Sequence, residues 1–235
     1  MTKELFLHDH YLKTCTAEVL EVVDGKKIVL DRTVFYPQGG GQPSDFGELK
    51  TGKGSFSVLS VRRMDGKILH EVDREGLQKG VGVECTLDWQ RRHKLMRFHT
   101  SAHLLAKVLF NETGALITGN QLEEEQSRMD FSSGAVEKEQ LKVFEEKTNE
   151  VISQNLEARI SFEKFGDAMK RPGLFRLKNV LPKNLPELRI VSIGEFDAQA
   201  DGGTHVANTQ EIGRIKILRL ENKGKENRRI YWELE

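Results

Sequence analysis

Short strand-like segments fill the first third of the chain and constrain its fold more than any other feature. Residues 17–30 and 56–72 each have the apolar pattern of two strands separated by an Asp-Gly pair, Asp24-Gly25 in the first and Asp65-Gly66 in the second. Asp-Gly between two such segments is a strong signal for a tight β-hairpin. Residues 81–87 then alternate cleanly between apolar and polar side chains. Five or more short strands at this spacing predict a small antiparallel barrel, because closure removes the exposed strand edges.

A long amphipathic segment begins directly after this region. Asp88 can accept hydrogen bonds from the free N–H groups of a helix that starts at Trp89, and Gly114 follows the last turn as a stop signal. We therefore place a domain boundary near Asp88. The predicted domains are a β-barrel over residues 1–88, which carries a glycine-rich loop, and a larger domain over residues 89–235.

The rest of the chain mixes helical and strand periodicity. A second amphipathic helix is expected over residues 136–152, because its apolar positions recur at steps of three and four. Strand-like segments occupy the remainder, at residues 115–131, 158–162, 188–193 and 215–234. The predicted fold class is therefore α+β, with a small antiparallel β-barrel followed by two long helices packed on an antiparallel sheet.

Composition narrows the classes of partner. Lysine plus arginine and aspartate plus glutamate each number 36, so the formal net charge is zero, which argues against a protein that coats nucleic acid by bulk charge. Cys15 and Cys85 are too few for a disulfide framework and are expected to be buried thiols. No segment approaches the ~18 consecutive apolar residues of a membrane span. We expect a soluble cytoplasmic protein without a membrane or DNA partner.

His99 and His103 lie four residues apart on one apolar face of the predicted helix. Residues at that spacing have Cβ atoms about 5–6 Å apart, which suits two imidazoles on one tetrahedral metal ion. His205 ends the turn Asp201-Gly202-Gly203-Thr204-His205, whose glycines would let the backbone curl so that nearby side chains converge. We predict one zinc ion per chain, held by these three histidines. The alternative is a set of core histidines satisfied by backbone partners.

Asp201, four residues before His205, has two chemically reasonable roles. It can be a fourth ligand, or it can orient an imidazole through a hydrogen bond. A three-histidine site with water, or with Gln199 nearby, is equally compatible with the sequence. Three protein ligands with one open position are typical of catalytic zinc, so His99, His103, Asp201 and His205 are the candidate catalytic residues.

Two familiar hydrolase classes fit this sequence poorly. Zinc proteases of the His-Glu-x-x-His type have a glutamate base directly after the first histidine, and Thr100 stands there. Ser101 is not in a nucleophile elbow, and a serine in the middle of a helix is common. The sequence therefore favours metal-assisted chemistry of another class.

Two further segments carry candidate ligand contacts. Gly39-Gly40-Gly41-Gln42 can approach a ligand closely and offer backbone N–H groups, although a mobile surface connection has the same composition. No Gly-Lys-Ser/Thr follows, so the segment is not a nucleotide P-loop. A basic cluster opens the histidine helix, and it is either a solvated face or a site that holds the phosphates of a nucleic-acid end: Arg91, Arg92, Lys94 and Arg97.

Together these motifs resemble the editing domain of alanyl-tRNA synthetase and its free-standing relatives, the AlaX trans-editing proteins. That family has a His-x-x-x-His helix, a later Cys-x-x-x-His and a glycine-rich stretch ahead of the helix. Here these match His99–His103, Asp201–His205 and residues 35–42. The match covers nearly the whole chain, which is similar to the medium-length AlaX-M class. Asp201 departs from the pattern, because the family has cysteine at that position.

The resemblance implies a zinc-dependent deacylase that acts in trans on alanine tRNA mischarged with serine or glycine. A pocket for alanine cannot strongly reject an analogue that adds a hydroxyl, so a second site must remove the errors. A site that hydrogen-bonds the serine hydroxyl would spare alanyl-tRNA, since alanine leaves the polar group of that site unpaired. The candidate substrate contacts are the backbone of Gly39–Gly41 together with the side chains of Gln42, Thr118 and Asn120.

Two roles of the predicted zinc remain open. In a deacylase it binds water or anchors the substrate amino group, while backbone N–H groups stabilise the developing oxyanion. The alternative is a non-catalytic tRNA- or ribosome-binding module, whose structural zinc would have a closed four-ligand site. The sequence does not define the oligomeric state.

Overall fold

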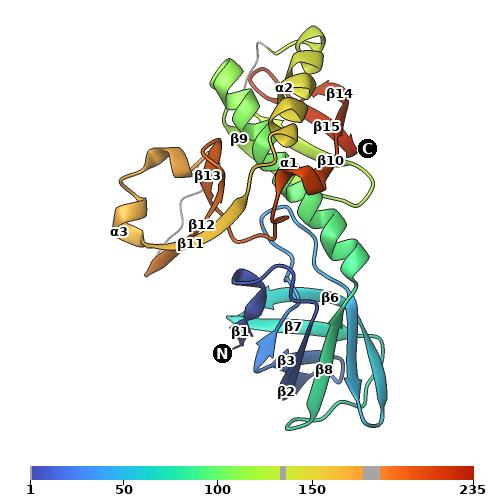
Figure 1. Cartoon of the computed structure of the whole chain (residues 1–235). Helices are drawn as coiled ribbons and strands as arrows, with labels where there is room; N and C mark the ends of the chain where they lie inside the picture. The colour runs from blue at the N-terminus through green and yellow to red at the C-terminus, as the bar shows by residue number, and fades with distance from the viewer. Residues whose placement is uncertain (1, 133–135, 177–185) are drawn as a thin grey trace. The chain divides into compact units, whose positions relative to one another are not determined.

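The computed structural model describes residues 2–132, 136–176 and 186–235 (Figure 1). The chain divides into two compact units, Met1–Leu95 and Met96–Glu235. The division falls within helix α1 (Trp89–Thr113), so the first turns of this helix belong to the barrel unit. No helix in the described ranges is long and apolar enough to cross a membrane.

The first unit is built around a closed antiparallel barrel with the strand order β2-β3-β7-β6-β5-β8, which confirms the predicted barrel (Figure 1). Two short strands, β1 and β4, pair in parallel beside it. The elements of this unit are β1 (Lys3–Glu4), η1 (Leu5–Leu7), β2 (Thr14–Val23), β3 (Lys27–Leu30), β4 (Arg32–Thr33), β5 (Gly47–Thr51), β6 (Gly54–Met64), β7 (Lys67–Val72) and β8 (Gly82–Leu87).

The two predicted Asp-Gly turns close hairpins of the barrel. Both residues of each turn have positive φ, 49° and 73° at Asp24-Gly25 and 50° and 74° at Asp65-Gly66. This conformation matches the twist of the flanking strands, and aspartate and glycine are among the residues that adopt it most readily. The turns join β2 to β3 and β6 to β7 as the sequence predicts.

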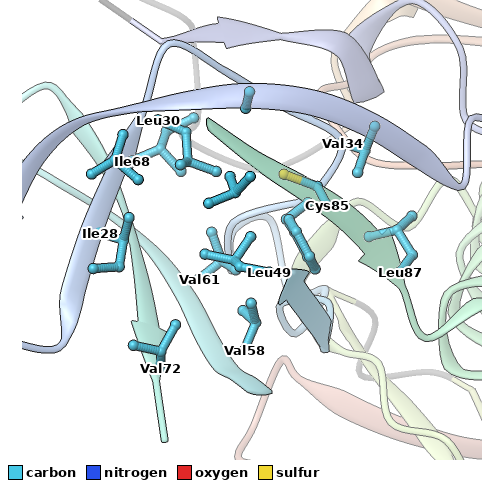
Figure 2. Close-up of a cluster of buried hydrophobic side chains, with 14 of the residues drawn as sticks. Ile28, Leu30, Val34, Leu49, Val58, Val61, Ile68, Val72, Cys85 and Leu87 are labelled. Carbon is cyan, nitrogen blue, oxygen red and sulfur yellow. The ribbon is translucent and has the colours of Figure 1, made fainter. Parts of the chain in front are cut away.

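The barrel interior is filled by branched aliphatic side chains from every strand (Figure 2). Ile28, Leu30 and Val61 are almost fully buried there. Cys85 on β8 is also buried, as predicted, whereas its neighbour across the strand pair, Cys15 on β2, is only partly buried. Both cysteines are free thiols.

Helix α1 begins and ends where the sequence predicts. Asp88 Oδ1 accepts a hydrogen bond of 3.1 Å from the N–H of Arg91, which satisfies one of the free donors of the first turn. At the other end Gly114 has φ +70° and its N–H donates to Phe110 O at 2.8 Å. A residue in this conformation ends a helix without the steric penalty that a side chain would add.

In its described residues the second unit has two antiparallel sheets, whereas a single sheet was expected. One has four strands in the order β14-β15-β10-β9, and the other has three in the order β11-β12-β13. The α+β class is confirmed. The elements that follow α1 are β9 (Ile117–Gln121), β10 (Ser127–Phe131), η2 (Lys138–Gln140), α2 (Leu141–Ser153), β11 (Ala158–Lys164), α3 (Phe165–Ala168), η3 (Pro172–Leu174), β12 (Glu187–Ile193), β13 (Asp197–Ala200), η4 (Thr209–Ile212), β14 (Ile215–Asn222) and β15 (Arg228–Leu234).

Side-chain contacts fix both helices to the four-stranded sheet. Phe98 of α1 packs against Trp232 of β15, with ring centroids 6.3 Å apart. On α2, the Asn149 side chain donates to Ile215 O and accepts from Ile215 N, both at 2.9 Å. These contacts hold the middle of α1, which carries His99 and His103, on a rigid scaffold.

Candidate metal centre

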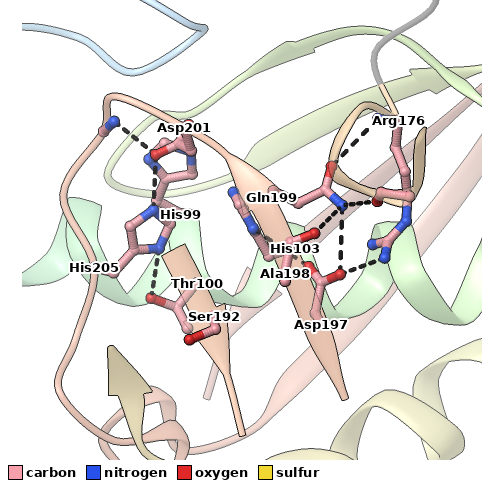
Figure 3. Close-up of polar contacts among 12 residues, drawn as sticks. His99, Thr100, His103, Arg176, Ser192, Asp197, Ala198, Gln199, Asp201 and His205 are labelled. Carbon is pink, nitrogen blue, oxygen red and sulfur yellow. Dashed lines mark hydrogen bonds and ion pairs between the residues drawn. The ribbon is translucent and has the colours of Figure 1, made fainter. Parts of the chain in front are cut away.

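Three imidazoles from distant parts of the second unit meet beside helix α1. His99 and His103 project from consecutive turns of the helix, and His205 comes from the loop that follows β13 (Figure 3). The ring centroid of His205 lies 4.4 Å from that of His99 and 4.7 Å from that of His103. Asp201 completes a group in which one ligand atom of each residue lies within 4.8 Å of the others. The structure therefore brings together all four residues predicted as metal ligands.

Thr100 determines which nitrogen of His205 carries the proton. Its hydroxyl donates to Met96 O at 3.0 Å and accepts from the N–H of Val206 at 3.2 Å. Because the single hydroxyl proton is used on Met96, the contact of 3.2 Å with Nδ1 of His205 requires Nδ1 to be the donor. The Nε2 atom of His205 is therefore left with a lone pair.

That lone pair faces a carboxylate. His205 Nε2 lies 3.0 Å from Asp201 Oδ2, and His99 Nε2 lies 3.5 Å from Asp201 Oδ1. A lone pair and a carboxylate oxygen at this distance repel each other unless a proton or a metal cation lies between them. The choice between proton and cation therefore decides what this group of residues is for.

Burial argues for the cation. Burial lowers the pKa of His99 to about 4 and, together with the neighbouring His99, lowers the pKa of His205 well below its usual value. Burial alone would raise the pKa of Asp201, but the adjacent His99 and His205 hold it well below its ordinary range. Neutral imidazoles beside an ionised carboxylate are the donor set that zinc prefers, so these residues fit a divalent cation.

Gly203 supplies space for the ring of His99. A Cβ atom at this position would lie 2.1 Å from Cε1 of His99, whereas a Cβ at Gly202 would meet nothing within 4 Å. Neither glycine has a φ in the left-handed region, so the expected backbone freedom is not what the turn uses. The N–H of Gly203 also donates to Asp201 Oδ2 at 2.6 Å, which orients that carboxylate.

Asp197 is a site residue that the sequence analysis missed. Its Oδ2 lies 3.5 Å from His103 Nδ1, and nothing closer satisfies either atom within the described part of the chain. Its other oxygen is paired with Arg176 (Figure 3). A carboxylate on Nδ1 favours the imidazole form whose Nε2 is free for a metal. Burial raises the pKa of Asp197, but His103 and Arg176 together hold it below its usual value.

The sequence does hold a signal for Asp197. Alternate residues of a strand share one face, so Asp197 and Gln199 on β13 and Asp201 just after it are expected on the same side. Gln199, the other neighbour considered from the sequence, is committed elsewhere. Its Nε2 donates to Ala198 O at 2.7 Å and to Gly173 O at 3.1 Å, and it also lies 3.5 Å from Oδ1 of Asp197.

Comparisons with known proteins identify the family of this chain. A family model described as "Threonyl and Alanyl tRNA synthetase second additional domain" matches residues 188–231, and one described as "tRNA synthetases class II (A)" matches residues 6–91. A protein of Methanosarcina barkeri named alanyl-tRNA editing protein AlaX-M is 43% identical over 241 residues, which cover 100% of this chain and 99% of the relative. The chain belongs to the AlaX-M family.

Two other relatives differ in length, one similar to this chain and one much longer. The protein of the same name from Saccharolobus solfataricus is 40% identical over an alignment of 238 residues that covers 100% of both chains. An alanine–tRNA ligase of Pyrobaculum aerophilum is 38% identical over 94% of this chain but only 25% of the ligase. The AlaX-M chain therefore corresponds to a quarter of that ligase.

Ser101 is structural in this AlaX-M chain. Its hydroxyl is fully buried, donates to Phe98 O at 2.8 Å and accepts from Trp232 Nε1 at 3.0 Å. The first bond lies within α1, and the second joins α1 to β15. This use agrees with the interpretation of Ser101 as a mid-helix serine rather than a nucleophile.

The glycine-rich stretch of the AlaX-M chain is an ordered turn in the first unit. Gly40 and Gly41 have φ +57° and +85°, and Gly39 and Gln42 exchange backbone hydrogen bonds of 3.1 and 2.9 Å. Tyr36 closes the turn further, because its hydroxyl donates to Gly39 O at 2.9 Å. Gln42 is buried, and a role of this turn in substrate binding stays a prediction.

Thr118 and Asn120 lie on β9, the edge strand of the four-stranded sheet. The Thr118 hydroxyl donates to Asn227 Oδ1 at 3.4 Å. Asn120 lies opposite Met129 of β10 in the register of the two strands. No contact within the described residues joins either side chain to the histidines. Their role as substrate contacts also stays a prediction.

The prediction that Arg92 binds tRNA phosphates is wrong, because its side chain is fully buried within the first unit. Its Nε lies 2.9 and 3.0 Å from the two carboxylate oxygens of Asp45, and its terminal nitrogens donate to Val34 O at 2.7 Å and His10 O at 3.1 Å. The guanidinium is therefore buried among partners of the first unit and does not reach the surface where RNA would bind. It fixes the first turns of α1 to the loop that carries Asp45.

The other members of the basic cluster are partly exposed and differ in their contacts. Arg97 donates to Ile212 O at 2.7 Å, and burial lowers its pKa. Arg91 stacks over the ring of Phe46, with Cζ 3.9 Å from the centroid. Arg91, Lys94 and Arg97 are all partly buried, and their contact with tRNA stays a prediction.

Proposed function

We propose that this AlaX-M chain is an aminoacyl-tRNA deacylase that removes serine, and also glycine, from mischarged alanine tRNA. It would act in trans, as a free-standing protein, and would depend on one zinc ion. Relatives that match the whole chain at 40–43% identity carry the name alanyl-tRNA editing protein, which supports the substrate class. The observation that carries the proposal is the meeting of three imidazoles, two of them buried, and a carboxylate at one point of the second unit.

His99, His103 and His205 would hold the zinc, with Asp201 either as a fourth ligand or as a carboxylate that orients the imidazoles. A bound zinc ion would supply Lewis-acid chemistry for ester hydrolysis or would hold the substrate amino group. The chain's own contribution is preorganisation. Thr100 holds the proton on Nδ1 of His205, so Nε2 of this histidine is ready to bind.

Selectivity for serine requires a polar group that alanine leaves unpaired. An unsatisfied buried donor or acceptor costs about 1–3 kcal/mol, which corresponds to roughly 5- to 150-fold discrimination against alanyl-tRNA. Gln42, Thr118 and Asn120 remain the candidates for that group, with the turn Gly39–Gly41 as a further substrate contact.

One observation favours a second candidate function. Asp201 faces the Nε2 atoms of both His99 and His205, so the four side chains can close around a cation without leaving an open position. A closed four-ligand site is typical of structural zinc. The protein would then be a non-catalytic tRNA- or ribosome-binding module.

Incubation with three charged forms of alanine tRNA separates the two candidates. The purified protein is mixed with seryl-, glycyl- and alanyl-tRNA(Ala), and the loss of each amino acid is followed over time. The deacylase predicts rapid loss of serine, loss of glycine and near-intact alanyl-tRNA. Binding of all three tRNAs without release of any amino acid, together with unfolding when zinc is chelated, would support the binding module instead.

A further inference from the structure

A pocket of about 730 Å³ lies in the second unit beside the candidate metal centre. It is bordered by the last turns of α1, by residues 171–176 and by the segment that joins β12 to β13. This volume is within the usual range for small-ligand sites, which is roughly 300–1,000 Å³. None of the residues predicted to bind substrate lines it.

An exposed aromatic ring flanked by cations lines this pocket. Phe110, on the last turns of α1, is 37% exposed although it is a large apolar side chain. Lys107 Nζ and Arg176 Cζ each lie 5.8 Å from the centroid of its ring. An exposed ring with adjacent cations is the arrangement by which proteins hold unpaired nucleotides, because the base stacks on the ring and the cations attract the phosphate.

Arg176 shows that the pocket has an unused hydrogen-bond donor. Its side chain is only 9% exposed and its Nη2 pairs with Asp197, but Nη1 has no hydrogen-bond partner in the described part of the chain. Buried donors are nearly always satisfied, so one without a partner beside a pocket indicates that a ligand oxygen supplies the missing acceptor.

Asp197 connects the pocket to the candidate metal centre. One face of this residue lines the pocket, and its Oδ2 lies 3.5 Å from His103 Nδ1 (Figure 3). In aminoacyl-tRNA the ester is carried by the ribose of the terminal adenosine. A substrate whose ester lies at the histidines must therefore place its last nucleotide close to them, and this pocket adjoins His103 through Asp197.

We propose that this pocket binds the unpaired 3′ end of the tRNA, with the terminal base stacked on Phe110 and the adjoining phosphate held by Lys107. The proposal rests on the proposed function, because it identifies where the tRNA part of that substrate lies. Arg171 also lines the pocket, but its charge is already paired with Glu163 at 2.5 Å, so Lys107 is the main phosphate contact.

Binding of two RNAs to the full-length chain tests this assignment. The first is an uncharged, fluorescently labelled acceptor-stem hairpin that ends in CCA, and the second is the same hairpin without the terminal adenosine. Affinity is measured by anisotropy over a series of salt concentrations. The variants are Phe110→Leu, which removes the aromatic face, Phe110→Tyr, which keeps it, and Lys107→Gln. Lys142→Gln, an exposed lysine of α2, is the matched control.

Phe110→Leu is expected to weaken binding of the CCA-ended hairpin by about 5- to 150-fold, which is the loss when one stacked base loses its aromatic partner. Phe110→Tyr should bind as wild type does, and the trimmed hairpin should not distinguish Phe110→Leu from wild type. Lys107→Gln should reduce the slope of log affinity against log salt by about 0.7, and Lys142→Gln should leave it unchanged.

Equal affinity of wild type and Phe110→Leu for the CCA-ended hairpin would overturn the assignment, as would an equal loss on both hairpins. Thermal unfolding of each variant shows whether it is folded. The release of serine from seryl-tRNA(Ala) by the same wild-type preparation keeps the two claims apart. Release without the expected binding pattern refutes the pocket alone, whereas the binding pattern without release refutes the proposed deacylase and leaves the pocket standing.

Discussion

The Nδ1 atom of His103 lies 3.5 Å from Oδ2 of Asp197, and the other oxygen of that carboxylate is paired with Arg176. A hydrogen-bond partner on the ring nitrogen that does not bind the metal fixes the orientation of the histidine and makes its other nitrogen a stronger ligand. Loss of such a partner typically lowers metal affinity by about 10–100-fold. We predict a zinc affinity lower by this factor in Asp197→Asn. Competition with a chromophoric chelator measures it.

Asp167→Asn is the control for this substitution. Asp167 is exposed and pairs with the nearby Lys170 at the surface. Its replacement should leave zinc affinity unchanged. A wild-type affinity in folded Asp197→Asn would show that Asp197 does not position His103.

Gly202 and Gly203 are adjacent in the turn between Asp201 and His205, so replacing each by alanine gives a matched pair of variants. Gly203→Ala places a methyl group 2.1 Å from Cε1 of His99, so either the ring or the turn must move. We expect this variant to lose most of its zinc. Gly202→Ala, where the new methyl group meets nothing within 4 Å, should keep it. Metal analysis of both proteins after dialysis decides, and equal zinc contents would mean that the contact at Gly203 does not control the site.

Arg92 and Asp45 form a buried ion pair within the first unit, with both side chains 0% exposed. Removal of one partner leaves an uncompensated buried charge, which costs about 3–5 kcal/mol. Arg92→Met should therefore lower the free energy of unfolding in urea by this amount. Arg74→Met removes a half-exposed arginine from a surface pair and should cost less than about 1 kcal/mol. If the two variants are equally stable but Arg92→Met binds tRNA more weakly, Arg92 is an RNA contact after all.

His70 makes the stability of the protein depend on pH. Its ring is fully buried, with Nε2 2.8 Å from Thr33 Oγ1 and Nδ1 3.0 Å from Ile28 O. Burial lowers its pKa from 6.5 to about 4. Between these values the unfolded chain binds more protons than the folded one, so stability rises with pH over this window and is lost as the pH falls through it.

The shift of His70 corresponds to a loss on the order of 3 kcal/mol from pH 7 to pH 4. Replacement by glutamine, which does not titrate, should flatten this part of the stability profile whatever its effect at pH 7. Urea unfolding at several pH values gives both curves. A variant whose stability falls as steeply as that of wild type would show that His70 is not responsible.

Local signals explain why much of the fold could be predicted from the sequence. Asp24-Gly25 and Asp65-Gly66 specify their turns through backbone preferences that need no tertiary context, and Asp88 does the same for the start of α1. Strand β13 was not predicted, because its four residues, Asp197–Ala200, are too few for their alternation of polar and small apolar side chains to indicate a strand. Its pairing with β12 forms it.

The candidate site likewise combines local features, which the sequence reveals, with non-local ones, which it does not. The spacing of His99 and His103 is a local property of one helix, so it was visible in the sequence. The burial of Arg92 is not local, because an arginine among other basic residues has the composition of a surface patch. Its place on the same helical stripe as Met96 and His99 was nevertheless available as a sign that it faces inward.

The central claim is that His99, His103 and His205 hold one zinc ion that the reaction needs. The most direct test is to measure the zinc content per chain of wild type, His99→Ala and His205→Ala together with the rate at which each preparation releases serine from seryl-tRNA(Ala). We predict one zinc per chain and rapid release for wild type, and loss of both in the two variants. A wild-type protein that releases serine without bound metal, or a His205→Ala protein that keeps the wild-type rate, would contradict the account.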